Sequence, residues 1–315
     1  MIDSRTPAFL IQINRCFLRC YAYFSQANRD DDRTSVPWLT EENKMTNKVT
    51  VPVDWYRQSL KALAPGHALA EQLGAELEIV SVVPSDDLRA VRESDVNGAL
   101  RERGLQALLR VLADTSPAEC LAEYCREQVD SLFCLATHAR GAAGETIMGS
   151  VAFRVLRDSG RPMVMIGPAL ADGWGPRVDT VMVCLDGSTF AESLLEPAAG
   201  LALQLGARLR LLQVFNPEVD ATPRGQDSAE WAYLRRLAGK IQRDKGITAD
   251  WETLHGKDAG RAITDYAAGL SGGMLALTTH GRTGAARVVM GGVAQSVCRS
   301  ASVPVLLHCP MGSSP

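Results

Sequence analysis

Short apolar runs alternate with longer amphipathic segments through the C-terminal half of the chain. Strands are predicted where β-branched and apolar residues run together, and helices where apolar residues recur at three- and four-residue spacing. Strands are therefore expected at 180–185, 209–215, 249–254, 274–279 and 304–307, and helices at 191–205, 228–243, 259–270 and 291–300. Gly206 is expected to cap the first of these helices.

The same pattern occurs twice along the chain. Residues 69–77 match residues 201–209 at seven of nine positions, an offset of 132. Further along, residues 149–152 fall on 291–294 with an offset of 142. Two collinear blocks separated by one ten-residue shift indicate an internal duplication. The shift falls in a segment predicted to be helical, so the second copy should have the longer helix.

Strands that alternate with helices predict a parallel sheet covered on both faces. We expect an α/β protein with two doubly wound parallel five-stranded sheets. A ligand in such a sheet binds at the carboxyl ends of the strands, where the strand order reverses. That point should lie between the first and fourth strands of each copy, just after Val53 and Ala136 in one and after Leu185 and Leu277 in the other.

The boundaries follow from the two copies. The first repeat spans 47–168 and the second repeat spans 178–310, joined by a linker at 169–177. Residues 1–46 show no clear period and are expected to be an extension that is disordered or artefactual, with Met45 as the natural start.

Composition narrows the function classes. The chain has 315 residues and a net charge of -3, without a strongly basic block, which disfavours nucleic acid as a partner. Polar residues such as Asn14 and Arg15 interrupt the apolar stretch near the start, which disfavours a membrane span. The eight cysteines form no CxxC pair and no zinc spacing, so neither a metal site nor a disulfide scaffold is expected. A cytoplasmic protein is predicted.

The sequence Asp186-Gly187-Ser188 follows the first strand of the second repeat. A carboxylate at this place can accept a hydrogen bond from an exocyclic amine or a ribose hydroxyl. An aspartate there can equally cap the following helix. The sequence leaves both readings open.

A glycine-containing loop, 278–284, follows the fourth strand, and Gly291 and Gly292 open the next helix. Glycines allow backbone N–H groups to approach an anion, and a helix N-terminus favours negative charge. Arg282 and Arg287 are placed to offset phosphate charge. The alternative is that these glycines only form turns.

Residues 47–309 resemble a pair of universal stress protein domains. The resemblance lies in Val51-Pro52-Val53-Asp54, in the helix ending at 70–75, in 149–152 with Pro162, in 183–188 and in 304–307. It implies a Rossmann-like, nucleotide alpha-hydrolase-like fold in each repeat, arranged as an internal pseudo-dimer. Single-domain relatives are expected to pair through their last strands. In this chain that pairing would place 163–166 beside 305–308.

Members of the family that bind ATP carry Gly, two residues, Gly, nine residues, Gly and then Ser or Thr. In the second repeat these positions are Thr278, Gly281, Gly291 and Gly292, so the first glycine and the final hydroxyl are missing.

In the first repeat the same positions are Ala136, Ala139, Gly149 and Ser150, so both loop glycines are missing. Trp55 also stands there where the second repeat has Gly187. The second repeat is therefore predicted to be the better nucleotide site.

The resemblance assigns adenine and ribose to Asp186 and the backbone near Val214, and phosphates to Gly281, Gly291 and Gly292. The predicted set in the second repeat is Asp186, Gly187, Ser188, Val214, Thr278, His280, Gly281, Gly291, Gly292 and Val293. The weaker set in the first repeat is Asp54, Val82, Ala136, Ala139, Gly149 and Ser150. His138 and His280 are expected to bond to local backbone rather than to act as catalytic bases.

Three functions compete at this point. The first is a stress-response regulator that binds ATP or another adenine nucleotide with little or no turnover. The second is a nucleotide-free scaffold or protein-interaction module with degraded phosphate loops. The third, an ATP-using enzyme, is disfavoured because the chain has no GxxxxGK[ST] or GxGxxG motif. A homodimer of the whole chain and an unidentified protein partner stay open.

Overall fold

A computed structural model describes residues 46–54, 58–137, 149–172, 174–175, 177–216, 226–280 and 290–309, with the backbone alone for 226–230. The predicted N-terminal extension lies outside these residues, apart from Thr46. Among the helices described, none is both long enough and apolar enough to cross a membrane.

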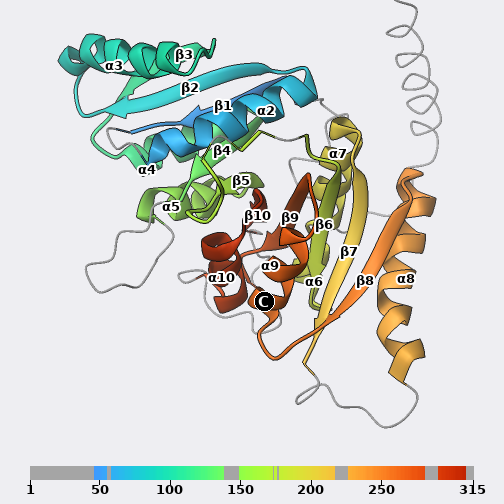
Figure 1. Ribbon diagram of the computed structural model, residues 1–315. Helices are drawn as coiled ribbons and strands as arrows, with labels where there is room; N and C mark the ends of the chain where they lie inside the picture. The colour runs from blue at the N-terminus through green and yellow to red at the C-terminus, as the bar shows by residue number, and fades with distance from the viewer. Residues whose placement is uncertain are drawn as a thin grey trace, which may run out of the picture. The chain divides into compact units, whose positions relative to one another are not determined.

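The first repeat contains five strands with helices between them (Figure 1). The strands are β1 (Lys48–Pro52), β2 (Glu76–Val83), β3 (Leu108–Ala113), β4 (Ser131–Ala136) and β5 (Met163–Ile166). The helices are η1 (Ser59–Ala62), α2 (Leu63–Leu73), η2 (Asp86–Leu88), α3 (Arg89–Glu102), α4 (Pro117–Glu127) and α5 (Ser150–Ser159).

The second repeat has the same order of elements. Its strands are β6 (Thr180–Leu185), β7 (Arg208–Phe215), β8 (Ala249–His255), β9 (Gly273–Thr278) and β10 (Val305–His308). Its helices are α6 (Thr189–Glu192), α7 (Leu195–Leu205), α8 (Gln226–Lys245), α9 (Ala259–Ala268) and α10 (Gly292–Ser300). As predicted, the helix before the third strand is longer here: α8 has 20 residues and α3 has 14.

The strands form one ten-stranded sheet in the order β3-β2-β1-β4-β5-β10-β9-β6-β7-β8. Within each repeat every pair is parallel, and the order reverses between β1 and β4 and between β6 and β9. This confirms the predicted α/β fold, because two doubly wound five-stranded halves are present. Each half therefore has the switch point at which such sheets bind ligands.

The two halves are joined by their last strands, as predicted from the resemblance. β10 pairs with β5 antiparallel, with Val305 opposite Met165 and Leu307 opposite Met163 (Figure 1). All four residues of each strand are buried. The junction thus covers two edges that would otherwise expose unpaired backbone groups.

Equivalent glutamines also tie the halves together. The Gln72 amide donates to the carbonyls of Val178 and Leu205 and accepts from the Val178 N–H, each at 2.8 Å. In the opposite direction, the Thr46 N–H donates to Gln204 Oε1 at 3.0 Å. Gln204 and Val178 lie 132 residues after Gln72 and Thr46, so each repeat holds the entry to the other's first strand with the same side chain.

One predicted helix is divided. Residues 191–205 were expected to form a single helix, but α6 ends at Glu192 and α7 begins at Leu195. Pro197 explains the break, because proline has no N–H to continue a helical ladder and fits only in a first turn. The predicted cap at the far end is confirmed, since Gly206 adopts a left-handed φ of 63°.

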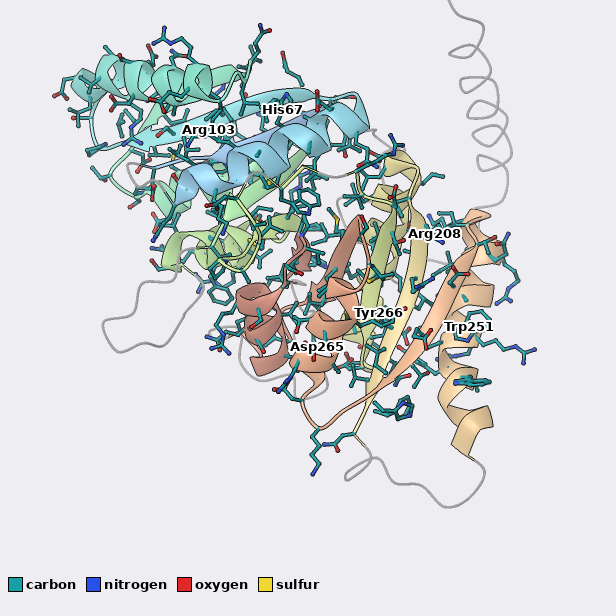
Figure 2. The ribbon with its side chains drawn as sticks, in the orientation of Figure 1. His67, Arg103, Arg208, Trp251, Asp265 and Tyr266 are labelled. Carbon is teal, nitrogen blue, oxygen red and sulfur yellow. The ribbon has the colours of Figure 1, made fainter. Side chains whose placement is uncertain are left out.

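A tyrosine at matching positions bonds to groups of opposite charge in the two repeats. In the first, the Tyr124 hydroxyl donates to both carboxylate oxygens of Glu78 at 2.9 Å. In the second, Arg210 donates to the hydroxyl of Tyr266 at 2.8 Å, and Tyr266 is labelled on α9 in Figure 2. Glu78 and Arg210 occupy matching positions of the two repeats, and so do Tyr124 and Tyr266. The tyrosine hydroxyl therefore bonds to a negative side chain in the first repeat and to a positive one in the second.

His308 lies at the end of β10, next to the junction, and is only 1% exposed. Burial lowers the pKa of its imidazole to about 4, although a hydrogen bond with the Gly160 backbone partly opposes this shift. A folded-state pKa below the ordinary 6.5 means that the unfolded chain binds the proton more tightly. Stability is therefore greatest above pH 6.5 and is lost as the pH falls toward 4.

We expect acidification from pH 7.5 to 5.5 to lower the free energy of unfolding by about 1.3 kcal/mol through His308 alone. Urea denaturation at both pH values measures this. His308→Ile, which installs the residue found at the matching position Ile166, should remove that part of the pH dependence. His67→Gln on α2, where the ring is one-third exposed, should leave it in place (Figure 2). An unchanged pH dependence in His308→Ile would contradict the prediction.

Candidate functional site

The switch point of the second repeat lies where β6 is flanked by β7 and β9. Leu185 pairs with Gln213, and Val183 pairs with Ala276. The ends of these strands therefore bring together three elements of the predicted site: Asp186 after β6, Val214 on β7 and Thr278 at the end of β9.

Asp186 organises the turn that leaves β6. Its Oδ1 accepts hydrogen bonds from the Ser188 N–H at 3.0 Å and the Ser188 hydroxyl at 2.6 Å. Ser188 is in turn the N-cap of α6 and accepts from the Ala191 N–H at 3.2 Å. Gly187 has a φ of 86°, a value that favours glycine. The capping role therefore belongs to Ser188, and the half-buried Asp186 carboxylate holds Ser188 in place.

The segment after β9 is held by its own polar groups. Thr278 donates its hydroxyl hydrogen bond to the His280 carbonyl at 2.7 Å. The Gly291 N–H donates to the Thr279 carbonyl at 2.8 Å. The His280 ring was expected to bond to backbone, but its Nδ1 lies 2.9 Å from the Thr279 hydroxyl. Two groups of the predicted nucleotide-binding set, the Thr278 hydroxyl and the Gly291 N–H, are thus already engaged.

The N-terminus of α10 presents the next candidates. Gly291 is the N-cap and forms no side-chain capping bond, while Gly292 and Val293 are exposed. A Cβ added at Gly292 would meet no atom of the described residues within 4 Å. The remaining predicted groups, Gly281 with Arg282 and Arg287, lie outside the described residues.

Two polar residues of this region were not predicted. Gln213 on β7 is 6% exposed, and its Oε1 has no hydrogen-bond partner among the described residues. Tyr233 on α8 is half-buried, and burial raises the pKa of its hydroxyl, with further contributions from Glu192 and Asp186. Both face the side of the sheet that α8 covers. A glutamine within an apolar strand was the available signal for Gln213.

The first repeat places its weaker set at the matching positions. Asp54 follows β1 and is exposed, and its N–H donates to the Ser59 hydroxyl at 3.0 Å. Val82 on β2 and Ala136 on β4 are half-buried, while Gly149 and Ser150 begin α5. Ala139, His138, Trp55 and Tyr56 lie outside the described residues.

Metal and thiol chemistry find little support in the described part of the chain. No group of three His, Cys, Asp or Glu side chains among those residues could hold a metal ion. Burial raises the pKa of Cys134 and of Cys298 to about 12, which keeps both thiols protonated and unreactive at neutral pH.

The strand order and the switch point in each half define a doubly wound, Rossmann-like α/β protein. The model of the universal stress protein family matches the chain twice, at residues 45–167 and 177–308. The chain therefore belongs to the universal stress protein family and carries its domain in tandem. Membership of this family indicates a role in the response to stress.

Known relatives agree with the tandem arrangement. Universal stress proteins of Mycobacterium bovis and Mycobacterium tuberculosis are 25% identical over 240 residues, which covers 73% of this chain and 79% of theirs. The crystal structure of a universal stress protein from Archaeoglobus fulgidus superposes with a TM-score of 0.60 at 22% identity. It covers 85% of this chain and 99% of that one. The similarity to the Archaeoglobus fulgidus structure supports the doubly wound α/β fold.

Proposed function

We propose that the protein is a stress-response regulator that binds ATP or another adenine nucleotide in its second repeat, with little or no turnover. The observation that carries the proposal is the buried Oε1 of Gln213, which has no hydrogen-bond partner among the described residues. Gln213 lies on β7 opposite Leu185, the residue that precedes Asp186. A buried acceptor without a donor is costly, and a ligand that supplies the donor relieves that cost.

An adenine base fits this requirement. Its exocyclic amine is a donor, and Gln213 Oε1, the Asp186 carboxylate and the Val214 carbonyl are all acceptors at the ends of neighbouring strands. The residues of the protein would position the adenine base and exclude water from it.

The phosphates would lie toward the N-terminus of α10. The first N–H groups of a helix have no partner within it, and the helix dipole favours an anion there. Gly292 and Val293 are exposed at this end. The Gly291 N–H, which was assigned to phosphate by resemblance, is bonded to Thr279 and is left out of the proposed set.

The alternative, a nucleotide-free interaction module, also has an observation in its favour. Thr278, the Gly291 N–H and the His280 ring bond within their own segment, and Gly292 offers no side-chain hydroxyl. Isothermal titration with ATP separates the two functions. One site per chain supports the regulator, whereas no heat at millimolar ATP supports the module. Phosphate release should stay at background in either case.

Gly292→Ser is expected to tighten ATP binding about tenfold. The change restores the hydroxyl that the family pattern carries, and a hydrogen bond to a charged group contributes about 1.5 kcal/mol or more. Among the described residues, no atom lies within 4 Å of the new Cβ, so the side chain has room there.

Gly291→Ala is the matched control for this prediction. Its Cβ would lie 3.0 Å from the Thr279 carbonyl oxygen, so it should not improve binding. Titration calorimetry compares both variants with the unaltered protein. Equal affinity of Gly292→Ser and the unaltered protein would place the phosphates elsewhere.

A further inference from the structure

A buried arginine reaches the switch point of the first repeat. Arg92 on α3 is 1% exposed, and its Nη1 donates to the Ser81 hydroxyl on β2 at 3.0 Å. Ser81 donates in turn to the Val53 carbonyl at 2.8 Å. Val53 immediately precedes Asp54. The guanidinium is therefore connected, through the Ser81 side chain, to the peptide bond between Val53 and the predicted ligand-binding Asp54.

The charges around this guanidinium come from two elements. Burial lowers the pKa of Arg92, and the negative charges of Asp54, after β1, and Asp95, on α3, oppose that shift. Both carboxylates are exposed. Asp95 follows Arg92 by about one turn of α3, and Asp54 lies at the carboxyl end of the strand that Ser81 contacts. A buried guanidinium requires a compensating charge. Of the two carboxylates, Asp54 is the one to which the hydrogen bonds through Ser81 and the Val53 carbonyl lead.

The second repeat lacks this arrangement. The residue that matches Arg92, at the offset of 142, is Leu234, which is fully buried on α8. Ser81 is replaced by Gln213, whose Oε1 has no partner among the described side chains. Asp186 instead accepts from Ser188. The described surroundings of the two equivalent aspartates therefore differ: Asp54 follows a strand that is hydrogen-bonded through Ser81 to a buried arginine, and Asp186 bonds to Ser188.

We propose that Arg92 is an internal counterion for Asp54, so that the aspartate of the first repeat serves the fold and nucleotide binding is confined to the second repeat. The confinement rests on the function proposed above, whereas the pairing of Arg92 with Asp54 does not. The ligand class excluded from the first repeat is a base whose exocyclic amine would compete with the guanidinium for Asp54.

A double-mutant cycle, read out as melting temperatures, tests the pairing of Arg92 with Asp54. Asp54→Asn removes the charge that faces Arg92 and should lower the melting temperature by about 3 °C. In the Arg92→Leu background, which installs the side chain of Leu234, the same change should have no effect beyond about 1 °C. Arg92→Met serves in the same way should the leucine variant fail to fold. An equal drop in both backgrounds, or no drop in either, would overturn the pairing.

Two matched variants complete the test. Asp186→Asn keeps an acceptor for Ser188, and the residue that matches Arg92 in this repeat is Leu234, so the melting temperature should be unchanged. Arg101→Leu alters an exposed arginine of the same helix, and Asp54→Asn should retain its full effect in that background.

Titration with ATP tests the confinement separately. The unaltered protein and Asp54→Asn should each bind one nucleotide per chain with the same affinity. Two sites in the unaltered protein, or weaker binding in Asp54→Asn, would overturn the confinement. A complete absence of ATP binding would refute the proposed function and leave the melting cycle as the measure of the pairing.

Discussion

Replacing Asp186 with alanine is expected to weaken ATP binding about tenfold or more, while the same change at Asp54 leaves binding unaltered. A carboxylate that accepts a hydrogen bond from a base or ribose contributes about 1.5–3 kcal/mol. The two aspartates occupy the same position of the duplicated fold. The strand next to Asp186 carries Gln213, whose Oε1 has no partner among the described residues, whereas the matching residue next to Asp54 is the hydrogen-bonded Ser81.

Asp186→Asn separates the two contributions of this carboxylate. The amide oxygen can still accept from Ser188 and hold the turn that opens α6, but the charge is lost. Its affinity should fall between those of the unaltered protein and Asp186→Ala. Isothermal titration with ATP measures all four proteins. A larger loss in Asp54→Ala than in Asp186→Ala would show that the wrong repeat has been assigned.

Arg161→Ala is expected to lower the free energy of unfolding by about 3 kcal/mol. The guanidinium donates to the carbonyls of Val129 at 2.8 Å and Ser131 at 3.2 Å. It also bonds to the carbonyls of Cys125, at 2.6 Å, and Gln128. These carbonyls belong to the end of α4 and the start of β4, where no helical N–H is available to them.

Two variants serve as controls for Arg161 in guanidinium denaturation. Arg161→Lys keeps the charge but concentrates the donors on one atom, so it should lose an intermediate amount. Arg126→Ala removes an exposed arginine from α4. Arg126 donates one long hydrogen bond of 3.4 Å to the Asp158 carbonyl, so its loss should change the free energy of unfolding by less than about 0.5 kcal/mol. A loss below about 1 kcal/mol in Arg161→Ala would mean that water replaces the guanidinium at these carbonyls.

The architecture was predictable because it depends on periodicity and on the duplication. Apolar runs give the strands, and the family resemblance placed β5 beside β10, which the antiparallel register confirms. The division between α6 and α7 was missed because apolar spacing continues through Pro197, although the missing N–H of that residue was visible in the sequence.

The site was less predictable because its polar contacts form between elements distant in the sequence. The pattern of glycines located the N-terminus of α10 but gave no sign that Thr279 would take the Gly291 N–H. Arg92 was overlooked in a polar helix, where arginine is ordinarily exposed. Comparison of the two repeats does not find it from the sequence alone, because Arg92 lies in the segment where the offset between the repeats changes.

The antiparallel seam between β5 and β10 has a consequence for how the two repeats evolve. A pair formed by separate identical chains must use one surface twice and falls apart on dilution. Here the partner is tethered to the same polypeptide, so association does not depend on expression level. Each half always meets a non-identical neighbour, and mutations can specialise one half without altering the other. The reversed charges at Glu78 and Arg210 illustrate this freedom.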